Sequence, residues 1–176
     1  MVARITSGAT PAGALYYNKD KIDRGEGRFL AFNTPMQVTD ERYFDIREAL
    51  RCFDPYLEAN RRTKNPVFHA SLNPAPEDRL TNDELRQIAR EYMERMGYGA
   101  QPCFVFLHED IERRHIHIVS LRVGLDGRKL AHDFEARRSR EILDALERHY
   151  GLRPAAEGDA KQTYDTLSKL DYTKSD

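Results

Sequence analysis

The segment Cys103–Val123 reads CFVFLHEDIERRHIHIVSLRV, and it holds two apolar runs separated by a short polar stretch. Cys103–Leu107 and His115–Val123 both have the β-branched and aromatic composition of strands. A parallel crossover needs a dozen or more residues, so two strands joined by this short loop must pair antiparallel. The segment therefore predicts a β-hairpin.

Around this hairpin the chain mixes strands and helices without a strict β-α-β alternation. Three more short apolar runs read as strands: Ala3–Ser7, Arg28–Phe32 and Val67–Leu72. Four segments read as helices: Ala12–Ile22, roughly Asp40–Phe53 with a stop before Pro55, the segment from Thr81 to Gly97, and a segment with Ile142 and Leu146 that ends at Gly151. We predict an α+β fold, with a mainly antiparallel central sheet of about five strands and helices packed on one face.

The helix after Thr81 has the clearest local signals. Thr81 and Glu84 form a T-x-x-E capping box, in which each side chain bonds a backbone N–H of the other residue. Apolar residues then recur at helical spacing up to Met96, and Gly97 suits the left-handed position that ends many helices.

The bulk composition limits the function classes. The chain has 176 residues, with 28 basic and 29 acidic side chains and a net charge of −1. This excludes a strong global field for nucleic acid but leaves room for a local basic patch. No apolar run has the length of a membrane span, and the N-terminus lacks the apolar core of a signal peptide, so we expect a cytoplasmic protein. Cys52 and Cys103 are too few for a disulfide scaffold.

Three of the six histidines lie in the hairpin segment, at His108, His115 and His117. Because side chains alternate along a strand, His115 and His117 share a face. If His108 pairs with His115, all three imidazoles converge at the open end of the hairpin, whereas a register shifted by one separates them. Three converging imidazoles predict a metal site with open coordination positions. The alternative is ordinary strand residues near a sheet end.

Asp110 and His69 are candidates for contact with this site. Asp110 is a candidate acceptor that holds a ligand imidazole in one tautomer, or a plain turn residue. His69 shares a face with Val67 and Ser71, and it approaches the site only if its strand neighbours the hairpin; the pattern favours a structural histidine. Three imidazoles bind Zn²⁺ or Cu²⁺ more tightly than Mn²⁺ or Mg²⁺. Selectivity also depends on geometry and metal availability, and therefore affinity alone does not identify the working ion.

Three blocks in order resemble a known family. The H-I-H-I-V strand with a histidine shortly upstream resembles the metal motif of HUH endonucleases, and within them of the relaxases of plasmid and transposon mobilization. The segment His69–Gly99 is similar to the one that precedes this motif, and Gly13–Ile22 resembles the family's tyrosine motif, most like relaxases of Bacteroides mobilizable elements. The resemblance covers roughly residues 1 to 151.

The resemblance implies a tyrosine nucleophile that attacks a DNA phosphate, and by matching position this is Tyr17. It also implies site- and strand-specific nicking at a transfer origin, a 5′-phosphotyrosine adduct, and a divalent ion, Mg²⁺ or Mn²⁺, at the histidines. In a helix over Ala12–Ile22, Leu15 and Ile22 form the core-facing stripe, and Tyr17 lies about 200° from Leu15. Tyr16 lies closer to the stripe and is able to pack there. Asp110 is a candidate for supporting proton removal from Tyr17.

The implied partner is transfer-origin DNA, with a single-stranded nick region beside a hairpin or duplex. Accessory mobilization proteins and a secretion-system coupling protein are further expected partners. The candidate DNA contacts are basic: Arg61, Arg62, Lys64, Arg113 and Arg114. For any one of these clusters a solvated charged face is the simpler interpretation.

Two other functions stay open. A metal-dependent hydrolase that uses an activated water keeps the three histidines and makes Tyr17 irrelevant. A non-catalytic module for single-stranded or hairpin DNA would use the histidines structurally. We expect residues 1–151 to form the catalytic domain, and residues 152–176, which are mostly polar, to be a linker or the start of a further C-terminal region.

Overall fold

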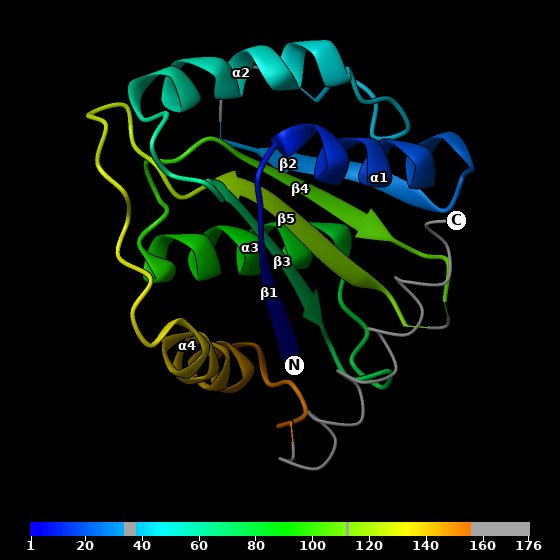
Figure 1. Ribbon diagram of the computed structural model, residues 1–176. Coiled ribbons are helices and arrows are strands. Elements are labelled where there is room, and N and C mark those ends of the chain that lie inside the picture. Colours follow the sequence, from blue (N-terminus) through cyan, green and yellow to red (C-terminus); the bar gives the residue numbers. More distant parts are fainter. Residues whose placement is uncertain (34–37, 112, 156–176) are drawn as a thin grey trace.

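The computed structural model describes residues 1–33, 38–111 and 113–155. The elements in chain order are β1 (Val2–Gly8), α1 (Pro11–Asp23), β2 (Gly27–Phe32), α2 (Ile46–Ala59), β3 (Val67–Asn73), α3 (Asn82–Met96), β4 (Cys103–His108), β5 (His115–Leu121) and α4 (Glu135–Tyr150). The strands form one sheet in the order β1-β3-β5-β4-β2, and every pairing is antiparallel (Figure 1). The α+β class and the five-stranded antiparallel sheet are therefore confirmed.

The hairpin of β4 and β5 has the register on which the histidine argument depends. His108 pairs with His115, and Phe106 pairs with His117. On the other side of β5, Ser71 of β3 pairs with His117. The central strand β5 is thus flanked by β4 and β3, and the strand that carries His69 is a direct neighbour of the strand that carries His115 and His117.

The helices cover both faces of the sheet, so the expectation of helices on one face is wrong. Ile116 and Ile118 belong to a core with α3 and α4, whereas Val119 and Leu121 belong to a second core with α1 and α2. In Figure 1, α1 and α2 lie over one face and α3 and α4 over the other. Because β5 carries apolar side chains on both faces, each face has to be covered to remove them from water.

The predicted caps hold for α3, while α2 differs. Thr81 and Glu84 form the capping box, and Gly97 ends α3 at φ 94°. Helix α2 does not stop before Pro55 but continues through it to Ala59. The proline removes one helical hydrogen bond, but Phe53 is fully buried, and Tyr56 and Leu57 pack against the same core. Burial of this apolar face stabilises the helical turn around Pro55, although proline has a low helix propensity.

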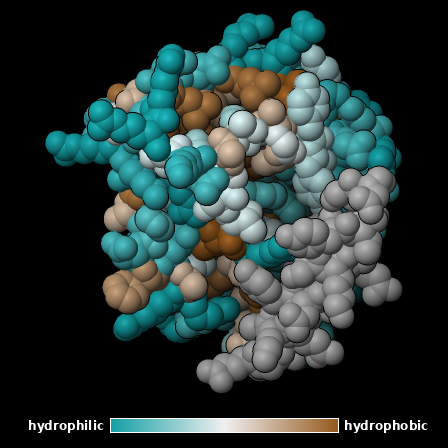
Figure 2. Space-filling model, viewed as in Figure 1, coloured by the Kyte–Doolittle hydropathy of each residue, from teal (hydrophilic) through white to brown (hydrophobic). Residues whose placement is uncertain are grey.

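Hydrophilic residues cover most of the face seen in Figure 2, with smaller apolar areas between them. Among the described residues, no helix has the length and apolarity needed to cross a bilayer. Of the segment 152–176, expected to be a linker or the start of a further region, residues 156–176 lie outside the described residues.

Candidate functional site

The hairpin brings His108, His115 and His117 into one buried cluster. One ring nitrogen from each lies within 4.8 Å of the corresponding nitrogens of the other two. The ring centroids of His108 and His117 are 3.9 Å apart, and that of His115 lies 5.2 Å and 5.1 Å from them. Nitrogens at this separation can bind one ion together after small rotamer adjustments.

A buried asparagine of α1 determines the tautomer of His108. Asn18 is 0% exposed, and its amide nitrogen donates to the carbonyl of Ala14, which can only accept. Its Oδ1 must therefore face His108, 2.7 Å from Nε2, so Nε2 carries the proton. The lone pair of His108 is then on Nδ1, a buried atom that has no hydrogen-bond partner within the described part of the chain. A metal ion would satisfy it.

The other two histidines are oriented in the same way through Nδ1. Nδ1 of His115 lies 3.2 Å from the carbonyl of Arg113, so that nitrogen donates and the ring lone pair is on Nε2. Nδ1 of His117 lies 2.9 Å from Nε2 of His69. If His117 binds metal through Nε2, its Nδ1–H donates to His69. His69, favoured from the sequence as a structural residue, thus contacts the cluster directly and orients it.

Burial keeps the imidazoles of His108 and His117 neutral. It lowers the pKa of both His108 and His117 well below the usual value, and the neighbouring histidines lower it further. A neutral imidazole offers the lone pair that a metal ion needs, and no proton has to be displaced at neutral pH. The donor set, its geometry and the neutral state of His108 and His117 therefore fit a divalent transition metal.

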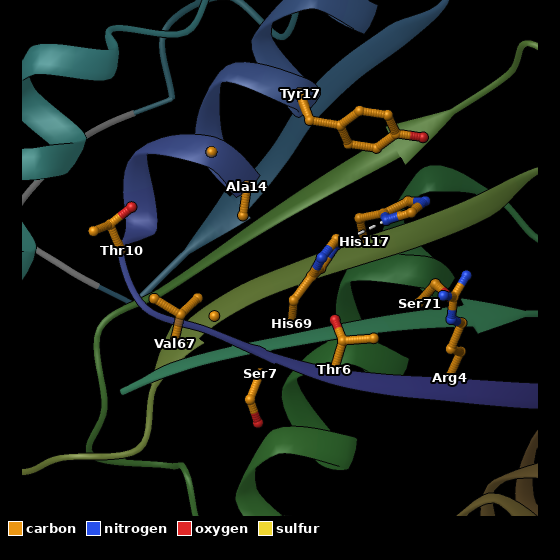
Figure 3. A pocket seen from close by; sticks show the side chains of 12 residues that line it. Arg4, Thr6, Ser7, Thr10, Ala14, Tyr17, Val67, His69, Ser71 and His117 are labelled. Carbon is orange, nitrogen blue, oxygen red and sulfur yellow. Dashed lines mark hydrogen bonds between the residues drawn. The ribbon is translucent and has the colours of Figure 1, made fainter. Parts of the chain in front are cut away.

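Tyr17 of α1 lies directly against this cluster. Its ring centroid is 5.6 Å from that of His108 and 5.8 Å from that of His117, and its side chain is half-buried. Figure 3 shows the ring projecting from α1 over the sheet beside His117. Leu15 and Ile22 are buried as predicted, whereas Tyr16, which was able to pack beside them, is 57% exposed and does not. Tyr16 points to solvent because the buried stripe of α1 is formed by Leu15, Asn18 and Ile22, and Tyr16 lies about 100° from Leu15 around the helix.

A buried ion pair stands next to Tyr17. Nζ of Lys21 lies 2.6 Å from Oδ2 of Asp110 and 5.9 Å from the Tyr17 ring centroid. Burial opposes ionisation of both groups, but their hydrogen bond outweighs it, raising the pKa of Lys21 and lowering that of Asp110. Both are charged at neutral pH. Asp110 thus holds an ammonium beside the phenol ring; its role in supporting Tyr17 stays a prediction.

Sequence reasoning missed Asn18 and Lys21, although a signal for Asn18 was present. Leu15, Asn18 and Ile22 follow helical spacing on one buried stripe of α1. A buried polar side chain on such a stripe requires a partner. The pattern therefore indicated that Asn18 meets another polar group across the core, but not which one.

The predicted DNA-contacting residues fall into two separate places. Arg114 donates to the carbonyl of Leu80 and to Asn82, so it ties the loop after β4 to the start of α3. Arg113 lines a hollow of about 470 Å³ beside it. The exposed side chains of Arg61, Arg62 and Lys64 precede β3, at the end of the sheet away from His115. The structure does not bring these two groups together.

Replacing Asn18 with Leu should weaken metal binding with little effect on the fold. The substitution keeps the volume but removes the acceptor that selects the His108 tautomer, and loss of such a partner typically lowers metal affinity about 10- to 100-fold. Titration calorimetry with Zn²⁺ measures this. Asp20→Asn, on the exposed side of the same helix, is the control and should bind as wild type. Unchanged affinity in Asn18→Leu would show that the tautomer is set by other groups.

Residues 17–152 match the family described as "Relaxase: MobA/VirD2-like, nuclease domain". A chain from a study titled "Molecular Basis of Vancomycin Resistance Transfer in Staphylococcus aureus" is similar in structure, with a TM-score of 0.48 and 11% sequence identity over 88% of this chain and 96% of that one. No curated protein matches. Neither finding supports the narrower likeness to Bacteroides elements.

Proposed function

Because the chain belongs to the MobA/VirD2-like relaxase nuclease family, we propose that it nicks one DNA strand at a transfer origin by attack of the Tyr17 hydroxyl on a phosphodiester. The observation that carries this is the position of Tyr17, with its ring 5.6 and 5.8 Å from the rings of His108 and His117. A phosphate bound at the histidine cluster would lie within reach of the phenol oxygen.

The reaction is a transesterification. The Tyr17 oxygen forms a bond to phosphorus, the bond from phosphorus to the 3′ oxygen breaks, and the phenol proton is lost. The products are a 5′-phosphotyrosine adduct and a free 3′-hydroxyl, which takes up a proton. The number of phosphoester bonds is unchanged, so the strand can be rejoined by reversal.

His108, through Nδ1, and His115 and His117, through Nε2, would hold a divalent ion. When bound, that ion supplies Lewis-acid stabilisation of charge on the phosphate oxygens. Resemblance to the family supports Mg²⁺ or Mn²⁺, whereas the all-imidazole donor set would bind Zn²⁺ or Cu²⁺ more tightly. The protein's part is to keep three neutral nitrogens facing one point, through Asn18 and His69.

Lys21 and Asp110 support the nucleophile in this proposal. The ammonium of Lys21 stands near the phenol that has to lose a proton, and a positive charge there favours the developing negative oxygen. Asp110 acts through Lys21, because their 2.6 Å hydrogen bond keeps the ammonium in place. Asp110 is therefore a positioning residue rather than the base.

The wider assignments are also part of the proposal. Arg113, together with the more distant Arg61, Arg62 and Lys64, would contact DNA phosphates flanking the nick, while Arg114 positions the loop. Residues 152–176 would lead to a C-terminal region, and accessory mobilization proteins and a coupling protein would be further partners. The motifs in Gly13–Ile22 and His69–Gly99 support a likeness to Bacteroides relaxases. A cytoplasmic location is also proposed, since the DNA substrate of the proposed reaction lies in the cytoplasm.

The test is covalent trapping on labelled single-stranded oligonucleotides that tile the transfer origin of the encoding element. We expect an adduct that survives denaturing electrophoresis, requires a divalent ion and is lost with a chelator. Cleavage without an adduct would replace the proposal with a hydrolase that uses activated water. Binding without any cleavage, with or without metal, would leave a DNA-binding module.

A further inference from the structure

A hollow of about 310 Å³ lies at the end of the sheet away from the histidine cluster, between the end of β1, the loop before β3 and the loop from β5 to α4 (Figure 1). Arg122, which lines it, follows His117 by five positions, about 17 Å along an extended chain. Because side chains alternate between faces, this odd separation places Arg122 on the opposite face of the sheet, over the ring of Phe68. The hollow is therefore separate from the site of Tyr17 and the histidines.

Arg122 is a buried arginine that keeps one hydrogen-bond donor in reserve. It is 3% exposed, and a guanidinium has five N–H donors. Nη1 donates to the hydroxyl of Tyr98, Nη1 and Nη2 donate to the two carboxylate oxygens of Glu135, and Nε donates to Oγ of Ser7. One N–H of Nη2 is left, and in a planar guanidinium it lies on the same edge as the Nε–H. This donor is therefore directed beside the Ser7 hydroxyl.

The hydroxyl of Ser7 adds a second donor at the same point. Its oxygen accepts from Nε of Arg122 at 3.1 Å, and in the described part of the chain no protein group accepts its own proton. Both residues line the hollow. An oxygen atom bound there would accept from Ser7 and Arg122 together. Such an acceptor is favourable, because a donor on a buried charged group loses free energy when it stays unpaired.

Two loops place lysines at the exposed rim of the hollow, and Asn60 ties these loops together. Its Oδ1 accepts from the backbone N–H of Thr63 at 3.1 Å, and its amide nitrogen donates to the carbonyl of Gly127 at 3.0 Å. The residue after Thr63 is Lys64, and Lys129 follows Gly127 by two positions. Both lysines line the hollow and have exposed side chains. The fold therefore holds two cations from distant parts of the chain around one cavity.

The positive charge of these lysines is not compensated within the hollow. Neither Lys64 nor Lys129 forms an ion pair with any carboxylate of residues 1–33, 38–111 and 113–155. No carboxylate is among the lining residues, and Glu135, which lies outside the lining, is already paired with Arg122. Two ammonium groups around one cavity repel each other, and an anion between them removes this repulsion. The hollow thus combines positive charge and hydrogen-bond donors with no acidic competitor.

We propose that this hollow binds a phosphate group, with Arg122 and Ser7 donating to its oxygens at the buried base and Lys64 and Lys129 neutralising its charge at the rim. A phosphate presents acceptor oxygens in several directions, whereas a carboxylate presents its oxygens in one plane, so donors from three parts of the chain favour phosphate. The group comes either from the DNA backbone or from free phosphate, and the experiment separates these sources. The inference does not depend on attack by Tyr17, since no step of that reaction uses the hollow.

The first part of the experiment titrates the metal-free protein with sodium phosphate and follows backbone amide signals by NMR, with sodium chloride at equal ionic strength as the reference. Amides of Ser7, Lys64 and Lys129 should shift and saturate. The double variant Lys64→Gln, Lys129→Gln should bind phosphate about tenfold more weakly, since two exposed charge contacts are lost. Both side chains are exposed, so the fold should be unchanged. No saturable shift, or equal affinity in the double variant, overturns the proposal.

A control with the same change in net charge is the double variant Arg47→Gln, Arg51→Gln, on the exposed side of α2. It should bind phosphate as wild type does. If it weakens phosphate binding as much as the lysine variant does, the effect is one of overall charge and the site is excluded.

The second part identifies the source of the phosphate group through the salt dependence of binding to transfer-origin oligonucleotides, in a Tyr17→Phe background so that no cleavage intervenes. If the DNA backbone occupies the hollow, the slope of log affinity against log salt should fall by about 1 for each lysine removed. An unchanged slope, with the phosphate shifts present, assigns the site to free phosphate. A lower slope without the phosphate shifts leaves only diffuse attraction and overturns the proposal. Neither part requires an adduct, so failure of the proposed reaction is a separate result.

Discussion

Tyr17→Phe should abolish formation of the protein–DNA adduct and lower strand cleavage about 1,000-fold or more, because removal of a nucleophile eliminates the covalent route. The ring is retained, so its contacts with His108 and His117 and the packing of α1 are preserved. Metal binding and DNA affinity should therefore stay at wild-type levels. Denaturing electrophoresis of labelled DNA after incubation with protein and metal measures the effect.

The adjacent tyrosine is a matched control. Tyr16→Phe removes the same hydroxyl one residue earlier, from a side chain that is 57% exposed. It should leave adduct formation within about twofold of wild type, the range of ordinary surface substitutions. If Tyr16→Phe abolishes the adduct and Tyr17→Phe does not, the nucleophile has been assigned to the wrong tyrosine.

His117→Gln should cause the second large loss, reducing metal affinity about 100-fold or more and removing cleavage with it, since one of the three proposed protein ligands disappears. His117 is the most connected of the three, with its Nδ1 bonded to His69 and its ring stacked on His108. Glutamine preserves much of the volume and the polar character, so the buried strand keeps its packing. Calorimetric titration with Zn²⁺ and Mn²⁺ measures the affinity.

Two further substitutions make this result specific. His149→Gln changes an exposed histidine of α4 and should alter neither metal affinity nor cleavage. His108→Gln should resemble His117→Gln, because both residues belong to the same cluster. Tight binding of one metal ion per chain in both His108→Gln and His117→Gln would exclude the three-histidine site, wherever the ion is then bound.

The sequence determined the parts of this protein that depend on local pattern. A short loop between two apolar runs requires an antiparallel hairpin, and the period of two places His115 and His117 on one face. The capping box of Thr81 and the glycine at Gly97 likewise define the ends of α3 through contacts within a few residues. The proposal that Tyr17 is the nucleophile came from resemblance to a family, because no local sequence pattern distinguishes a nucleophilic tyrosine in a helix from a structural one.

Only the tertiary structure decided which distant residues meet. That α1 and α2 cover one face and α3 and α4 the other depends on how two apolar faces are shared among four helices, which no single helix encodes. The contacts of Asn18 with His108, of His69 with His117 and of Lys21 with Asp110 join residues 48 to 90 positions apart. Sequence spacing shows that a buried polar group needs a partner, but packing of α1 and β3 against the hairpin chooses it.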